Sequence, residues 1–327
     1  MVFKLKNSSI ELWLGLVIII LSVFFALNTD SFFTIRNLLD LAESYSVMGI
    51  FALGLFVVLV TGGIDISFAA IASSVQYIVA TFAMKFGFSD PTLGIVAAMF
   101  LGLMFGFINA TLIYYFNIVS IIITISMQSV LFGLLMWLTN GINIYNLPEW
   151  MMDFYHVIPF TYEGVRYQIG LPFLTLIILS IISWFLLKKT NIGRQLYATG
   201  GSVESARRVG VNVAFIHFFA YGWCGVMAAI GGLVQIYRVN EVVPSALVGT
   251  ELDVLAAVVL GGSSLSGGKG SVFGTIMGVF CIGILKNGLN LIGVSNYFSN
   301  VVIGSVILIA ITVTHFGKRQ ETNFGFS

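Results

Sequence analysis

The chain has 327 residues, of which 58% are hydrophobic and only 9% charged, and its 15 Lys and Arg nearly balance its 14 Asp and Glu. A soluble domain of this length carries roughly 25% charged residues to cover its surface, so most of this surface must face lipid rather than water. The net charge of +1 also excludes the basic excess with which nucleic-acid-binding proteins neutralise phosphates.

Apolar runs long enough for membrane helices recur along the chain, since a helix crosses the hydrocarbon core with about 20 residues. Residues 46–60 and 66–84 lie on either side of a glycine break, and the run 252–260 is too short to span alone. The other runs are residues 10–27, 91–115, 120–138, 171–187, 213–236, 272–291 and 297–316. The sequence therefore predicts an all-α polytopic membrane protein of about ten helices, some short or broken, in a single domain over residues 1–327.

The distribution of Lys and Arg favours an orientation with both termini in the cytoplasm. Ten of the 15 then lie in inner segments and four in outer segments, while Lys286 lies near the end of a span, and this is the bias that the positive-inside rule describes. The inner residues are Lys4, Lys6, Lys188, Lys189, Arg194, Arg207, Arg208, Lys269, Lys318 and Arg319. The outer residues are Arg36, Lys85, Arg166 and Arg238.

Two hydrophilic segments are long enough to have a role of their own. Residues 140–168 lie on the outer side in this orientation, and their aromatic and acidic side chains suit a loop at the lipid interface. Residues 188–212 lie on the inner side and contain the signature of a short helix. Ser202 is its N-cap, and Glu204 lies in its first turn. Arg207 and Arg208 lie in its last turn, and Gly210 ends it. This pattern predicts a rigid basic projection between two membrane helices.

Ionisable residues and glycine breaks occur together at membrane depth in two places. Ionised side chains there must face protein or water, and irregular backbone is tolerated only where it lines a cavity or is buried in protein. The glycines that we expect to break helices are Gly62, Gly63, Gly261 and Gly262. The residues that we expect along a pathway are Asp65, Ser67, Gln76, Asn109, Gln128, Asn287 and Asn290.

Each of these polar residues also has a simpler explanation. Asp65, assisted by Ser67, can cap the helix that follows it. Asparagine and glutamine side chains can hold membrane helices together by hydrogen bonds without touching any solute. The sequence leaves both explanations open.

The sequence offers no group of residues for catalysis. The three histidines lie far apart, and the two cysteines, Cys224 and Cys281, lie in separate apolar stretches. The glycines around Lys269 do not have the spacing of a phosphate-binding loop. We therefore expect no catalytic residue, no metal and no cofactor in this chain.

A series of motifs along the chain carries a family resemblance. They read Thr61-Gly62-Gly63-Ile64-Asp65-Ile66-Ser67, Ala198-Thr199-Gly200-Gly201, Gly261-Gly262-Ser263-Ser264-Leu265, Gly267-Gly268-Lys269-Gly270-Ser271 and Asn287-Gly288-Leu289-Asn290-Leu291. With these motifs the chain resembles the permease subunit of bacterial ATP-binding-cassette (ABC) importers of the ribose, xylose and galactose type. The resemblance covers nearly the whole sequence.

The resemblance implies a multipass subunit of the bacterial inner membrane that does no ATP chemistry itself. The partners it implies are a second permease copy or a paralogue, ATPase subunits on the inner side, and a periplasmic protein that delivers a monosaccharide or similar hydroxylated solute. It also implies that one inner segment couples to the ATPase, through Gly200, Gly201, Ser202, Glu204, Ala206, Arg207, Arg208 and Gly210. The alternative is a stand-alone, ion-coupled secondary transporter with Asp65 as the coupling carboxylate.

Overall fold

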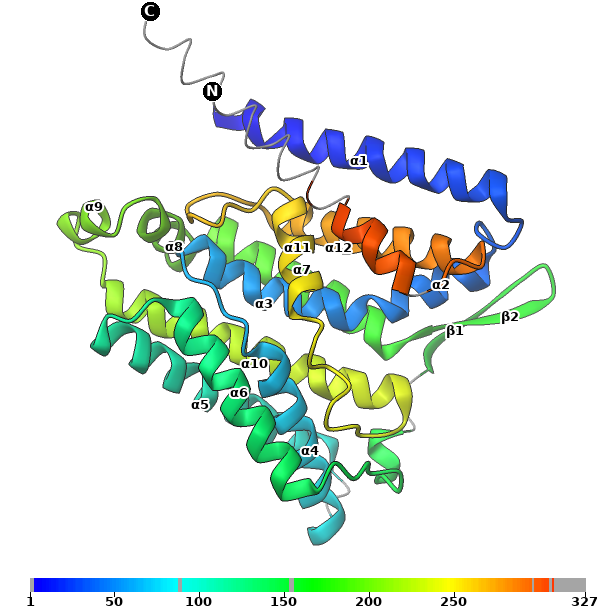
Figure 1. Ribbon diagram of the computed structural model, residues 1–327, viewed down its shortest axis with the longest axis horizontal. Helices are drawn as coiled ribbons and strands as arrows, with labels where there is room; N and C mark the ends of the chain where they lie inside the picture. Colours follow the sequence, from blue (N-terminus) through cyan, green and yellow to red (C-terminus); the bar gives the residue numbers. More distant parts are fainter. Residues whose placement is uncertain (1–2, 88–89, 153–155, 296, 306–307, 309–327) are drawn as a thin grey trace, which may run out of the picture.

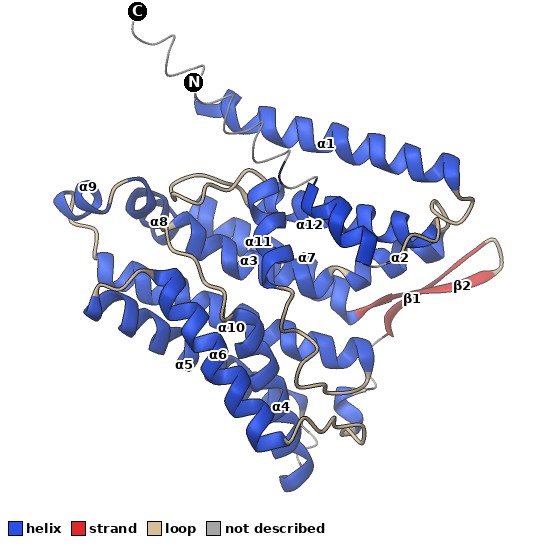
Figure 2. Ribbon diagram, in the orientation of Figure 1, coloured by secondary structure: helices blue, strands red, loops and turns tan. Residues whose placement is uncertain are grey.

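The computed structural model describes residues 3–87, 90–152, 156–295, 297–305 and 308, and most of its regular structure is helical (Figures 1 and 2). The first half of the chain forms α1 (Phe3–Asn28), α2 (Ile35–Ser44), α3 (Ser46–Val60), α4 (Phe68–Phe86), α5 (Pro91–Phe116) and α6 (Ser120–Thr139). The middle forms η1 (Glu149–Met151), β1 (His156–Tyr162) and β2 (Val165–Gly170). The second half forms α7 (Leu171–Lys189), α8 (Asn191–Gly201), α9 (Val203–Arg208), α10 (Val213–Val239), α11 (Glu251–Leu260) and α12 (Val272–Leu291).

Within the described residues, eight helical segments are long and apolar enough to cross a membrane. One of them, Ile35–Val60, joins α2 and α3, and the others lie in α1, α4, α5, α6, α7, α10 and α12. Helix α11 has only ten residues and ends at a glycine pair, in agreement with the prediction of a short helix. The last expected span, residues 297–316, runs past the described residues. The protein is a helical, polytopic membrane protein, and the count of ten spans stays a prediction.

The core forms around α3 and α10. Every residue of α3 except Met48 is buried, and a helix that is apolar on all sides is stable only when other elements surround it. Helix α10 packs against α3, α4, α5 and α7, whereas α1 packs on the outside against α12. Only 11% of the apolar segment of α1 is buried in the chain, so most of its surface faces outward.

The segment between α6 and α7 contains structure that the sequence did not predict. Strands β1 and β2 pair as an antiparallel hairpin, which turns at Glu163 and Gly164 with φ angles of 50° and 76°. Trp150 is only 5% exposed and packs against Gly94 of α5. Glu43 of α2 accepts a 2.7 Å hydrogen bond from the backbone nitrogen of Gly170. The expected loop is therefore a folded segment attached to α2 and α5.

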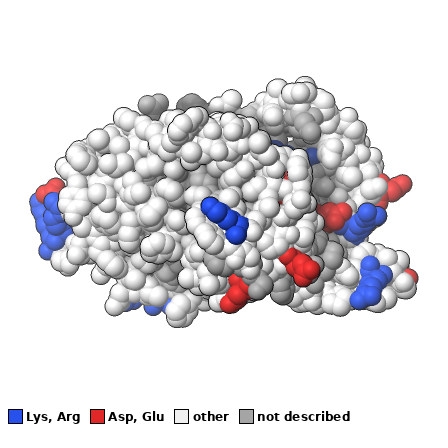
Figure 3. All heavy atoms as spheres, turned by 90° about the horizontal axis from the view of Figure 1, so that it is seen from below, with Lys and Arg blue, Asp and Glu red and all other residues white. Residues whose placement is uncertain are grey.

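The bundle has two chemically different ends. Helices α3 and α7 end, and α10 and α12 begin, at the end that carries α8 and α9, whereas the β-hairpin lies at the opposite end (Figure 1). Following the predicted orientation, we call them the inner and the outer end. Figure 3 shows a face that is mostly uncharged, with groups of charged side chains at its left and right edges and a few charged side chains nearer its middle. A surface with so few charged side chains suits a bundle that is largely surrounded by lipid.

Candidate functional site

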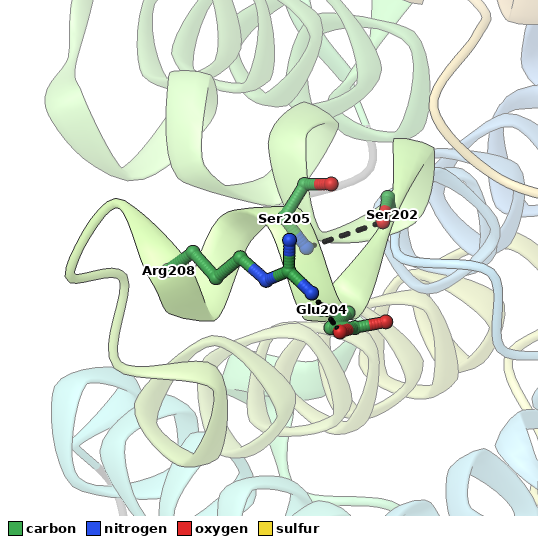
Figure 4. A network of polar contacts seen from close by, with 4 residues as sticks. All are labelled: Ser202, Glu204, Ser205 and Arg208. Atoms are coloured by element: carbon green, nitrogen blue, oxygen red, sulfur yellow. Dashed lines mark hydrogen bonds and ion pairs between the residues drawn. The ribbon is translucent and has the colours of Figure 1, made fainter.

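Helix α9 at the inner end has the capped form that the sequence predicts. The Oγ atom of Ser202 accepts a 3.2 Å hydrogen bond from the backbone nitrogen of Ser205 (Figure 4). Gly210 follows the helix with a φ of 85°, a conformation that favours glycine. Ala206 is the buried residue of this short helix and anchors it to the protein. The prediction of a short capped helix is confirmed.

The charged side chains of α9 lie on the surface. Arg208 forms an ion pair with Glu204 one turn away (Figure 4), and both side chains are exposed. An exposed pair of this kind contributes at most about 1 kcal/mol. Arg207 is exposed as well and has no ion-pair partner within the described part of the chain. Both guanidinium groups are therefore accessible to another protein.

Replacing Ser202 by alanine is expected to fray the start of α9, because the backbone N–H of Ser205 loses its acceptor. Removal of such a cap costs about 0.5–2 kcal/mol. Hydrogen–deuterium exchange of residues 203–208 should accelerate, while exchange in α8 stays unchanged. Ser205→Ala is the matched control, because it keeps the backbone donor. Equal exchange in the two variants would contradict the role of Ser202 as the cap.

The sequence did not predict α8, which precedes α9 directly. Thr190 caps it by accepting a 3.2 Å hydrogen bond from the backbone nitrogen of Gly193. Gly200 and Gly201, which were expected in the coupling segment, lie in the last turn of this helix. The inner segment is thus a pair of capped helices rather than one helix in a loop.

Three segments meet at the inner end around the backbone of the last residue of α3. The carbonyl oxygen of Val60 accepts a 2.9 Å hydrogen bond from the nitrogen of Gly268. It also lies so close to Gly200 of α8 that a Cβ atom there would overlap it. Gly62 has a φ of 87° and lies beside Gly267. We call Gly62, Gly200, Gly267 and Gly268 the glycine junction, which joins α3, α8 and the loop before α12.

Tyr197 adds a side-chain contact to the glycine junction. Its hydroxyl group donates a 3.0 Å hydrogen bond to the carbonyl oxygen of Gly270. Burial raises the pKa of Tyr197 to about 12, so the hydroxyl group stays protonated at neutral pH and remains a donor. Sequence reasoning missed Tyr197 and Val60, because nothing in either residue type indicates which distant backbone atoms it contacts.

The first glycine break places three of the predicted pathway residues side by side. Ser67 donates to Oδ1 of Asp65 from its backbone nitrogen at 2.8 Å and from its hydroxyl group at 2.7 Å. Asn109 of α5 donates a 2.8 Å hydrogen bond to the hydroxyl oxygen of Ser67. All three residues have an exposed fraction of 0%. Asp65 therefore orders the turn into α4, and in the single chain it does not reach solvent.

The two predicted glutamines lie away from this cluster. Gln76 is buried in α4 with an exposed fraction of 1%. Gln128 of α6 donates a 2.7 Å hydrogen bond to Glu251, the first residue of α11. The other carboxylate oxygen of Glu251 accepts a 2.7 Å bond from the nitrogen of Gly249. Gln128 thus connects α6 to the short helix.

The two predicted asparagines of α12 lie near the outer end. Asn287 exchanges two amide hydrogen bonds with Asn37 of α2, at 3.0 and 2.9 Å. Asn290 is exposed. Gly261 and Gly262 follow α11 directly, whereas Thr61 separates Gly62 and Gly63 from the end of α3. In the single chain the predicted pathway residues therefore lie in several places rather than around one centre, and the sequence missed Asn37.

The chain is similar to known membrane permeases. A family model described as the permease component of the branched-chain amino acid transport system matches residues 37–311. The chain belongs to this permease family. The ribose import permease protein RbsC of Bacillus subtilis is 37% identical over 301 residues, which cover 91% of this chain and 90% of that one. RbsC of Escherichia coli is 34% identical over 295 residues, 89% of each chain.

A third relative of this permease is the D-allose transport system permease protein AlsC of Escherichia coli, which is 28% identical. The alignment covers 90% of this chain and 88% of AlsC. No solved structure matches. The predicted site residues, from Gly62 to Asn290, all lie within the range that the permease family model matches. The family description mentions amino acids whereas these relatives are named for sugars. The family therefore establishes a transport component and not the solute.

Proposed function

We propose that this permease is the transmembrane subunit of an ABC importer that carries a monosaccharide or a similar small hydroxylated solute. The observation that carries the proposal is 34–37% identity to ribose import permeases over about nine-tenths of the chain. More distant relatives are named for xylose and D-allose. The protein lies in the bacterial inner membrane as a single permease domain, with ten spans and both termini in the cytoplasm, as the distribution of Lys and Arg favours.

The permease works with three kinds of partner. A second permease copy or a paralogue completes the pathway, ATPase subunits bind at the inner end, and a periplasmic binding protein delivers the solute at the outer end. ATP binding and hydrolysis in the partner move the permeases between outward-open and inward-open forms. The chain itself only provides the pathway and the contact surface.

Helices α8 and α9 form the segment that couples the permease to the ATPase. Their exposed arginines are available for acidic side chains of the partner, and the capped helices hold these arginines in a fixed position. The glycine junction links this segment to α3 and to the loop before α12. The residues proposed for coupling are Gly200, Gly201, Ser202, Glu204, Ala206, Arg207, Arg208 and Gly210.

The candidate pathway residues divide by their burial into two groups. Gln128, Asn287 and Asn290 are partly or fully exposed in the single chain, and we assign them to the pathway surface. The second group is buried and consists of Asp65, Ser67, Gln76 and Asn109. These residues contact the solute only when the helices around the first glycine break separate. The breaks at Gly62, Gly63, Gly261 and Gly262 provide the irregular backbone at which such movement takes place.

Reconstitution in proteoliposomes tests the function. The permease is reconstituted with its ATPase and its binding protein, and uptake of radiolabelled D-ribose, D-xylose and D-allose is measured. We expect uptake of at least one sugar that requires both ATP inside and the binding protein outside. Uptake driven by a proton or sodium gradient without ATP would instead support the secondary transporter.

Asp65→Asn is expected to retain most of the ATP-dependent uptake. The amide oxygen can accept the same two hydrogen bonds from Ser67, whereas a proton-coupled carrier needs the carboxylate. Asp65→Ala removes both bonds and is expected to destabilise the protein by about 1–3 kcal/mol. The measurements are the uptake rate and the thermal unfolding of the purified complex. Loss of uptake in a stably folded Asp65→Asn complex would contradict the ATP-driven mechanism.

A further inference from the structure

A polar cavity of about 460 Å³ opens at the outer end of the bundle. It lies where α2, the last turns of α10 and α12, and the helical residues 297–305 meet. Its lining includes Asp40, Tyr45, Arg238, Lys286, Asn287 and Asn290. Because α10 and α12 begin at the inner end and finish beside the cavity, it lies far from α8 and α9 (Figure 1). We call it the outer cavity.

Neighbouring residues hold three of the polar side chains of the outer cavity in place. The Nζ atom of Lys286 lies 2.5 Å from Oδ2 of Asp253 in α11. Arg238 donates a 3.2 Å hydrogen bond to the hydroxyl oxygen of Ser44. The amide pair described above fixes Asn287. Side chains that are already ordered lower the entropy cost of binding a ligand.

The groups around the outer cavity favour a neutral ligand with several hydroxyl groups. Arg238 and Lys286 only donate hydrogen bonds, the carboxylate of Asp40 only accepts them, and the asparagine amides do both. A hydroxyl group also does both, so it can bond to every member of this set. The negative charge of Asp40 would repel an anion, and the positive charges of Arg238 and Lys286 would repel a cation. The volume lies within the range of small-molecule sites.

We propose that the outer cavity is a low-affinity binding site for the monosaccharide, occupied after the binding protein releases it and before it enters the pathway. This inference rests on the proposed function. Asp40 and Asn290 are exposed, so water competes for their hydrogen bonds and the affinity is weak. Weak binding suits this step, because the sugar must leave the site again in every cycle.

Two exposed residues allow a test that leaves the fold intact. The side chains of Asp40 and Asn290 line the outer cavity and have no hydrogen bond within the described part of the structure. The test variant is therefore Asp40→Asn combined with Asn290→Ala. Asp30→Asn is the matched control, because Asp30 is exposed near the outer end of α1 and does not line the outer cavity.

The complex of permease and ATPase in nanodiscs, without binding protein, is titrated with the radiolabelled sugar that the uptake assay identifies. We expect saturable binding in the millimolar range, weakened about tenfold in the double variant and unchanged in Asp30→Asn. D-gluconate, a polyhydroxylated anion, should compete poorly. Absence of saturable binding, or equal binding by the double variant, would overturn the inference.

A parallel measurement separates this inference from the proposed function. The wild-type complex is tested for ATP-dependent uptake with its binding protein present. If no sugar is taken up, the proposed function fails. If uptake is normal and binding is absent or unaffected by the double variant, only the assignment of the outer cavity fails.

Discussion

Replacing Gly200 by alanine is expected to reduce ATP-dependent uptake by about tenfold or more. The added Cβ atom would overlap the carbonyl oxygen of Val60 and lie against the nitrogen of Gly268. Both neighbours are backbone atoms, so α8 must move away from α3, and this breaks the glycine junction. Overpacking of this kind costs about 1–3 kcal/mol. Uptake and ATP hydrolysis are measured together, and we expect hydrolysis to continue without transport.

Gly201→Ala is the matched control for this experiment. Gly201 is the next residue of the same helix, and a Cβ atom added there would have no neighbour within 4 Å. The two variants make the same chemical change at neighbouring positions. Any general effect of alanine on the stability of α8 is therefore present in both, and comparing them removes it. Normal uptake by Gly200→Ala would show that the glycine junction is not needed for coupling.

Replacing both Arg207 and Arg208 by alanine is expected to abolish uptake while leaving membrane insertion and stability intact. The only ion pair lost within the described residues is the exposed one with Glu204, which contributes at most about 1 kcal/mol. A large loss of uptake would therefore come from a missing contact with another protein. The measurements are uptake, thermal unfolding and the amount of ATPase that co-purifies with the permease.

Lys188→Ala combined with Lys189→Ala provides the control for charge. These residues lie in the last turn of α7, at the same end of the bundle, and are exposed. The control removes the same net charge at the inner end without changing α9. If it weakens ATPase binding as much as the arginine variant does, the inner end attracts the partner only through its overall charge. Full uptake by the arginine variant would remove the coupling assignment.

The sequence was sufficient to predict elements whose cause is local. The apolar runs predicted the long helices, and the spacing from Ser202 to Gly210 predicted α9, because capping depends on residues within one turn. Helix α8 was missed because it has no apolar run and contains several glycines, a poor composition for a helix. Its stability comes from packing against α3, α7 and α10.

The contacts that join distant segments could not be predicted in the same way. The bond between Val60 and Gly268 uses only backbone atoms, so no side chain indicates it. The pair of Asn37 and Asn287 joins residues 250 positions apart. The sequence marked Asn287 as polar at membrane depth but gave no reason to choose its partner. The outer cavity likewise arises from four segments that meet only in the folded bundle.

The burial of α3 has a consequence for communication across the membrane. This helix of 15 residues, about 22 Å long, has one end in the glycine junction and the other beside Tyr45, which lines the outer cavity. A helix enclosed on all sides tends to move as one piece, because bending it would open voids in the core. We therefore expect that a displacement of α8 by the ATPase shifts α3 along its axis. This shift would move Tyr45 and so change the outer cavity in the same step.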